Sequence, residues 1–184
     1  MKHKSELFNK SGVKNITGCG ILPYSIHKGK IFFLLGREAK YTEWKDGHKW
    51  AEFAGHRNDN ESMFDATIRE GYEEIMGLIS KDDIKKKIKI NDLLVYNNST
   101  AFLIKIPYNP KLPQIFNNFY TYMTSQYNES FFVNSIIDKG TFEKDQIQWF
   151  EYNEIIELSK KDILREAMIM YLPQIKEFIK VKLK

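Results

Sequence analysis

Residues 55–77 hold the feature that most constrains the fold, G-H-R-N-D-N-E-S-M-F-D-A-T-I-R-E-G-Y-E-E-I-M-G. A helical period of about 100° per residue places three carboxylates on one face, those of Glu70, Glu73 and Glu74. The opposite face is apolar and carries Phe64, Ile68, Tyr72 and Ile75. Like charges at this spacing destabilise a helix by about 0.2–0.5 kcal/mol per pair, so a segment built only to fold has little reason to keep them. A divalent cation such as Mg²⁺, which prefers oxygen ligands, would relieve the repulsion.

The same segment resembles the signature of the Nudix hydrolases, which reads G, five residues, E, seven residues, R-E, an apolar residue, any residue, E-E, any residue, G. The positions that match in identity and spacing are Gly55, Glu61, Arg69, Glu70, Glu73 and Glu74. Three positions depart from the signature: His56 stands where a second glycine is usual, Gly71 replaces the apolar residue, and Gly77 comes one residue late. The F-A-G-H stretch and the late glycine resemble divergent Nudix proteins of large DNA viruses and protists. We expect Gly71 to let the helix sit close on a strand.

The resemblance implies an α/β fold, a Nudix-type α/β/α sandwich with a mixed β-sheet between helices, formed by one domain over residues 1–184. Alternating and apolar runs predict strands at 17–26, 30–37, 50–55, 92–96, 100–107 and around 147–152. Helices are predicted from the N-cap residue Ser62 to about residue 76, and at 115–127, 154–158 and 162–183, whereas 81–90 is either a short charged helix or a connection.

Two prolines and two unusual segments qualify this outline. Pro23 predicts that the first strand is an edge strand or is interrupted, and Pro173 predicts a kink or a break between two closing helices. Residues 1–15 are polar and are predicted to form a flexible N-terminus. Residues 108–142 form a candidate specificity insertion, although an aromatic-rich helix there also fits ordinary packing.

Composition limits the compartment and the partners. Cys19 is the one cysteine, so no internal disulfide can form and a reducing, cytoplasmic or nuclear setting is favoured. We expect a cytoplasmic protein with no membrane partner, because the chain has no secretory leader and no apolar run of membrane length. The net charge of +4 is too mild to indicate nucleic-acid binding by itself. Lysines do concentrate at 81–90 and 180–184, either as a solvated face or as a surface for a polyanionic substrate.

By the resemblance, water attacks phosphorus in a diphosphate linkage with the help of Mg²⁺ or Mn²⁺. The resemblance implies metal ligands at Glu74, Glu73 and Glu70 and at a backbone carbonyl, that of Ala54 or Gly55. Glu70 is also a candidate base. Arg69 is expected to form a bidentate contact with Glu61 that braces the loop against the helix. A later acid often joins such a site, and Glu143 is the first candidate, ahead of Asp145 and Glu129.

Further residues are candidates for substrate contacts, namely Arg37, Trp44, Trp50 and His56. The tryptophans could stack on a base or pack in the core, and His56 could touch phosphate or exchange a proton near neutral pH.

The leading hypothesis is a metal-dependent pyrophosphohydrolase that acts on a nucleoside diphosphate derivative or a related polyphosphate. The substrate is then a small-molecule nucleotide or polyphosphate. One alternative is an enzyme that hydrolyses the mRNA cap, with RNA as partner. Another is a catalytically inactive Nudix-fold module that binds a nucleotide or RNA. The altered glycine pair favours the inactive module, whereas the intact acid pairs argue against it.

Overall fold

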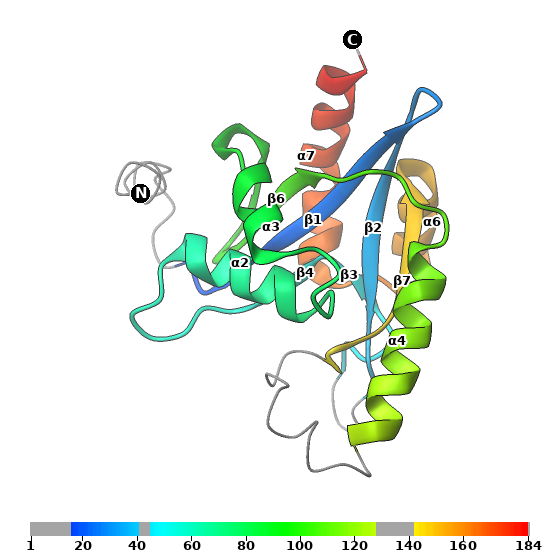
Figure 1. Ribbon diagram of the computed structural model, residues 1–184. Helices are drawn as coiled ribbons and strands as arrows, with labels where there is room; N and C mark the ends of the chain where they lie inside the picture. The colour runs from blue at the N-terminus through cyan, green and yellow to red at the C-terminus, as the bar shows by residue number, and fades with distance from the viewer. Residues whose placement is uncertain (1–15, 41–44, 128–141, 184) are drawn as a thin grey trace.

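The computed structural model describes residues 16–40, 45–127 and 142–183 (Figure 1). Trp44, Glu129 and the predicted flexible segment 1–15 lie outside the described residues. The strands are β1 (Gly18–His27), β2 (Lys30–Glu38), β3 (Trp50–Ala51), β4 (Phe53–His56), β5 (Leu93–Tyr96), β6 (Ser99–Lys105) and β7 (Lys144–Glu151). The helices are α2 (Met63–Glu73), α3 (Lys81–Lys87), a short 3₁₀ helix η1 (Ile90–Asp92), α4 (Leu112–Tyr127), α6 (Tyr152–Lys160) and α7 (Glu166–Lys182).

The seven strands form one mixed sheet built around β1. On one edge, β1 pairs in parallel with β6, which continues antiparallel to β5. On its other edge, β1 pairs antiparallel with β4 over its first residues and with β2 over its last. The far edge of β2 pairs with β7. The predicted mixed sheet between helices is therefore confirmed.

Pro23 does not mark an edge strand, so this alternative was wrong, whereas pairing along one edge of β1 is interrupted at this residue. The residue lies in the central strand β1, opposite Ile104 of β6. On the other edge of β1, pairing with β4 ends at Ile21 and pairing with β2 begins at Tyr24. A proline, which cannot donate a backbone hydrogen bond, thus stands where the chain changes partners.

Helices cover both faces of the sheet (Figure 1). On one face, Ile84 of α3 and Phe116 of α4 join the hydrophobic core together with Ile75, which follows α2, and α2 packs Ile68 and Tyr72 against this core. Helices α6 and α7 contribute Ile155 and Tyr171 to the core on the other. In the described part of the chain, no helix is long and apolar enough to cross a membrane.

Local sequence signals set the ends of α2. The Ser62 hydroxyl accepts a hydrogen bond from the backbone N–H of Asp65, as expected of an N-cap. Beyond the helix, Gly77 takes a left-handed φ of 73°, a conformation that glycine adopts at little cost. Gly71 faces β1 so closely that a Cβ would lie 2.8 Å from Ile21 Cδ1. The helix therefore sits on the strand as the missing side chain predicts.

Pro173 does not break the closing helix, which runs unbroken from Glu166 to Lys182. The predicted division into two helices was wrong. Proline removes one backbone hydrogen bond of a helix, while Tyr171, Leu172 and Ile175 on both sides of it bury their side chains against the sheet. Their burial holds α7 together.

Candidate functional site

Arg69, in the second half of α2, is the centre of an ion-pair network. Its guanidinium makes the expected bidentate contact with Glu61, with both nitrogen–oxygen distances 2.9 Å. Its Nη1 donates to Glu70 Oε1 at 2.7 Å and to Glu73 Oε2 at 3.2 Å. Its Nη2 also donates to the backbone carbonyl oxygen of His56 at 2.9 Å. One side chain thus ties the loop after β4 to the acidic face of the helix.

The three helix carboxylates point into the protein. Glu70, Glu73 and Glu74 are 5%, 6% and 1% exposed, so the acidic face is not a solvated surface. Gly55 approaches this face so closely that a Cβ there would lie 2.3 Å from Glu70 Oε2. A side chain at position 55 would displace the carboxylate, which explains glycine at the start of the segment.

Glu74 is held by a buried lysine. Its Oε2 accepts from the backbone N–H of Ala54 at 2.8 Å and lies 3.3 Å from Lys144 Nζ. Lys144 also pairs with Glu38, which in turn lies 3.0 Å from Arg165 Nη1. Burial alone would lower the pKa of Lys144, but Glu74 and Glu38 raise it above its ordinary value. The ammonium therefore stays charged inside the protein.

Acidic side chains outnumber basic ones in this cluster. Burial raises the pKa of Glu74 well above its ordinary value although Lys144 opposes the shift. Burial also raises the pKa of Glu143 and of Glu52. The carboxylates in the cluster are those of Glu38, Glu52, Glu61, Glu70, Glu73, Glu74 and Glu143, whereas its cations are Arg69, Lys144 and Arg165.

Glu70 has a pKa in the range of a neutral-pH acid or base. Burial raises the pKa of this carboxyl to about 7, while the hydrogen bond from Arg69 opposes the rise. The negative charges of Glu73 and Glu143 add to the increase. Glu143, the later acid predicted from sequence, is thus close enough to act on the helix carboxylates.

Three solved structures share the fold at low sequence identity. An Ap4A hydrolase of C. elegans in a binary complex is 20% identical, with a TM-score of 0.54, and the match covers 90% of this chain and 98% of that chain. A MutT/Nudix family protein of Listeria innocua is 18% identical, with a TM-score of 0.53, over 90% of this chain and 94% of that chain. The Nudix domain of Shewanella oneidensis NrtR, complexed with ADP ribose, is 11% identical, with a TM-score of 0.50, over 97% and 99% of the two chains. The chain has the Nudix hydrolase fold.

A viral relative is similar over part of its length. The uncharacterized protein L534 of Acanthamoeba polyphaga mimivirus is 32% identical over 102 residues, a match that covers 49% of this chain and 33% of the viral protein. The chain therefore spans about a third of the length of this relative. No sequence profile of a known protein family matches the chain.

The candidate substrate residues do not all gather at the acidic helix of the Nudix fold. Arg37 Nε is 2.8 Å from Asp145 Oδ1, so this guanidinium already has a carboxylate partner. Trp50 packs edge-on against Phe150, 5.0 Å between ring centroids, in the core that α6 and α7 cover. His56 is exposed at the end of β4, and it touches Arg69 through its backbone.

The described first part of the candidate specificity insertion packs against the core through α4. Helix α4 buries Phe116 in the core, whereas Phe119 and Tyr122 are exposed. The role of this segment in specificity stays a prediction.

Sequence reasoning missed Lys144, Glu38 and Arg165. Lys144 and Glu38 are 106 positions apart in the chain, so no local spacing relates them. A lysine beside the candidate acid Glu143 was visible, but no pattern marks a lysine as buried. Only the pairing of β2 with β7 brings the two groups together.

Proposed function

We propose that this protein is a metal-dependent hydrolase that cleaves a diphosphate linkage in a nucleoside diphosphate derivative or a related polyphosphate. The observation that carries the proposal is the burial of Glu70, Glu73 and Glu74 on one face of α2, with Arg69 bracing them against the preceding loop. Phosphoryl transfer depends mainly on positioning and on neutralising charge. Such a carboxylate cluster recruits the cation that does both.

The donor chemistry fits a hard divalent cation such as Mg²⁺ or Mn²⁺. Glu70 Oε2 and Glu74 Oε1 have no hydrogen-bond partner among the described residues and are the oxygens we assign to it. No group of three or more His, Cys, Asp or Glu side chains stands in a metal-binding arrangement in the described ranges. In the metal-free protein, Arg69 pairs with Glu70 and Lys144 pairs with Glu74. A bound cation would supply positive charge to the phosphate oxygens and lower the pKa of an attached water.

The side chains have separate tasks in this proposal. Glu70, with its pKa raised to about 7, suits proton removal from the attacking water near neutral pH. Glu73 and Glu61 orient Arg69, which in turn fixes the loop that follows Gly55 and the end of β4. Glu143 directly precedes β7 and adds a further carboxylate whose charge acts on Glu70 and Glu74.

Two solved structures of the same fold support a choice of substrate class. One is an Ap4A hydrolase, and another is complexed with ADP ribose. Both molecules contain a phosphoanhydride between two groups, at least one of which is a nucleoside. We therefore place nucleoside diphosphate derivatives first, ahead of capped RNA and of inositol pyrophosphates.

The second candidate function is a nucleotide-binding module without turnover. Lys144 favours it, because an ammonium already neutralises Glu74, which is the first choice as direct metal ligand. The repelling acids argue against it, since a module that never binds a cation gains nothing from burying them.

A turnover screen with Mg²⁺ and with Mn²⁺ separates the two functions. The panel contains Ap4A, ADP ribose, nucleoside triphosphates, inositol pyrophosphates and capped RNA, and the readout is release of phosphate or of a mononucleotide. We expect turnover that falls at least 100-fold in Glu74→Gln and stays unchanged in Glu177→Gln, an exposed glutamate on α7. Binding of a nucleotide with no turnover under either metal would instead establish the binding module.

A further inference from the structure

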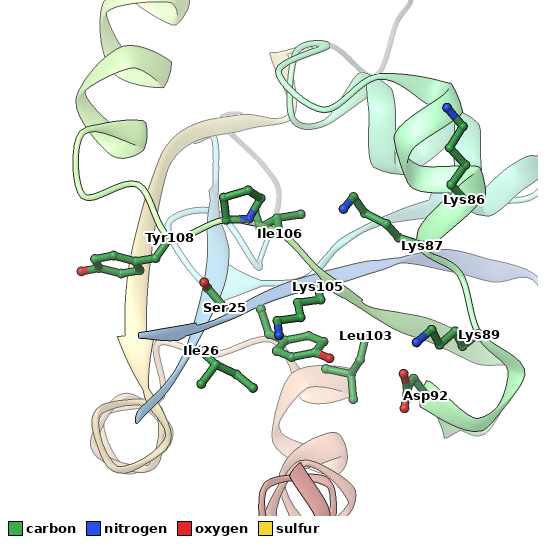
Figure 2. Close-up of a pocket in the computed structure, with 12 residues that line it drawn as sticks. Ser25, Ile26, Lys86, Lys87, Lys89, Asp92, Leu103, Lys105, Ile106 and Tyr108 are labelled. Carbon is green, nitrogen blue, oxygen red and sulfur yellow. The ribbon is translucent and has the colours of Figure 1, made fainter. Parts of the chain in front are cut away.

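A pocket lies at the opposite end of β1 from the carboxylates, and Figure 2 shows the residues that line it. Its volume is ≈ 470 Å³. It is lined by Tyr24, Ser25, Ile26, Lys86, Lys87, Lys89, Asp92, Leu103, Lys105, Ile106, Pro107 and Tyr108. Position 19 of β1 pairs with Gly55 beside the acidic helix, whereas the pocket is reached at position 24. Five residues of strand separate the two by about 17 Å.

Four lysines give this pocket its charge. Lys86 and Lys87 come from α3, Lys89 follows that helix, and Lys105 ends β6 (Figure 2). None of the four forms an ion pair with another described residue. The one acid in the lining, Asp92, has its Oδ1 3.3 Å from Lys182 Nζ. The four lysines therefore bring positive charge to the pocket with little counter-charge.

Helix stability accounts for only part of this arrangement. Lysines in the last turn of a helix interact favourably with its dipole, which applies to Lys86 and Lys87. Lys89 and Lys105 lie outside that helix and gain nothing from it. Lysines from separate elements converge where an anion would relieve their repulsion.

The remaining lining adds a buried hydroxyl and an apolar floor. Ser25 is 2% exposed, and its side chain has no hydrogen bond to any described residue. Tyr24, Leu103 and Ile106, which also line the pocket, are buried. A hydroxyl of this kind can donate to a phosphate oxygen at the base of the pocket.

We propose that this pocket binds the phosphate groups of a small polyphosphorylated molecule, at a site separate from the acidic helix. Its volume is in the range of small-molecule pockets. Lysine binds phosphate as a point charge without a fixed approach direction, so several lysines accommodate several phosphates. The site does not depend on the proposed hydrolase activity.

Isothermal titration calorimetry in EDTA tests the site while metal-dependent turnover is suppressed. The probes are inositol hexakisphosphate and inorganic tripolyphosphate. The variant Lys87→Gln/Lys105→Gln removes two pocket charges, and Lys160→Gln/Lys161→Gln removes two exposed charges at the end of α6. We expect the Kd of the probes to rise at least tenfold in the pocket variant and less than twofold in the surface variant. Glu70→Gln should leave probe binding unchanged.

Three results would overturn the proposal. The first is absence of binding by either probe to the unmodified protein. The second is equal weakening in the two lysine variants, because the probes would then respond only to overall charge. The third is single-stranded RNA that binds through Lys87 and Lys105 at least tenfold more tightly than either probe, since the ligand would then be nucleic acid.

Discussion

At the scale of single residues, the protonation of Glu70 makes the stability of the protein depend on pH. Burial raises its pKa from 4.5 to about 7 in the metal-free protein. Between these values the native state binds more protons than the unfolded state, so the contribution of Glu70 to stability falls as pH rises. The full difference is about 3 kcal/mol at most.

The first prediction compares the wild type with Glu70→Gln by urea unfolding in EDTA from pH 5 to pH 8. The free energy of unfolding of the wild type should decline relative to that of the variant across this range, because glutamine does not titrate. A difference between the two proteins that stays constant with pH would show that the carboxyl is not perturbed.

Lys144 gives a second prediction at this scale. Its side chain is fully buried between Glu38 and Glu74, and removal of one partner from a buried ion pair costs roughly 3–5 kcal/mol. Lys144→Met should therefore destabilise the metal-free protein by about that amount. Lys160→Met, which removes an exposed pair with Glu157, should cost less than about 1 kcal/mol.

The same pair of variants tests whether a cation can replace the lost ammonium. Added Mn²⁺ should raise the melting temperature of Lys144→Met by more than that of the wild type, as measured by differential scanning fluorimetry. Equal increases in both proteins would mean that the metal does not act at Glu74.

At the scale of elements, the contact of α2 with β1 depends on Gly71. A Cβ at this position would lie 2.8 Å and 2.9 Å from two side-chain carbons of the buried Ile21. Overpacking costs about 1–3 kcal/mol, which exceeds the gain of about 1 kcal/mol that alanine brings to a helix. Gly71→Ala should lower the free energy of unfolding, and Ile21→Val should reduce that loss because it removes Cδ1. Stabilisation by Gly71→Ala alone would refute the close contact.

The elements also show what the sequence can predict. Helix α2 was predictable because Ser62, the apolar residues and Gly77 are local signals with a fixed period. The Glu61–Arg69 contact followed from the matched signature. The predictions of an edge strand at Pro23 and of a break at Pro173 were wrong, because the effect of each proline depends on strand partners and on burial contributed by distant parts of the chain.

At the scale of the whole molecule, opposite charges are separated within a chain whose net charge is only +4. Carboxylates predominate beside α2, whereas four lysines line the pocket at the other end of β1. The net charge of the chain gives only the small difference between its acidic and basic side chains, and it does not show that they lie in separate regions. The sequence predicted the acidic group from its spacing in one helix, but the lysine pocket needs α3 and β6 to come together.

The central claim is that the buried carboxylates of α2 hold a divalent cation, and Mn²⁺ binding tests it most directly. Electron paramagnetic resonance counts free Mn²⁺ during a titration of the wild type, Glu74→Gln and the surface control Glu177→Gln. We predict that Glu74→Gln weakens Mn²⁺ binding at least tenfold and that Glu177→Gln leaves it unchanged. Equal Mn²⁺ affinity in all three proteins would contradict the account.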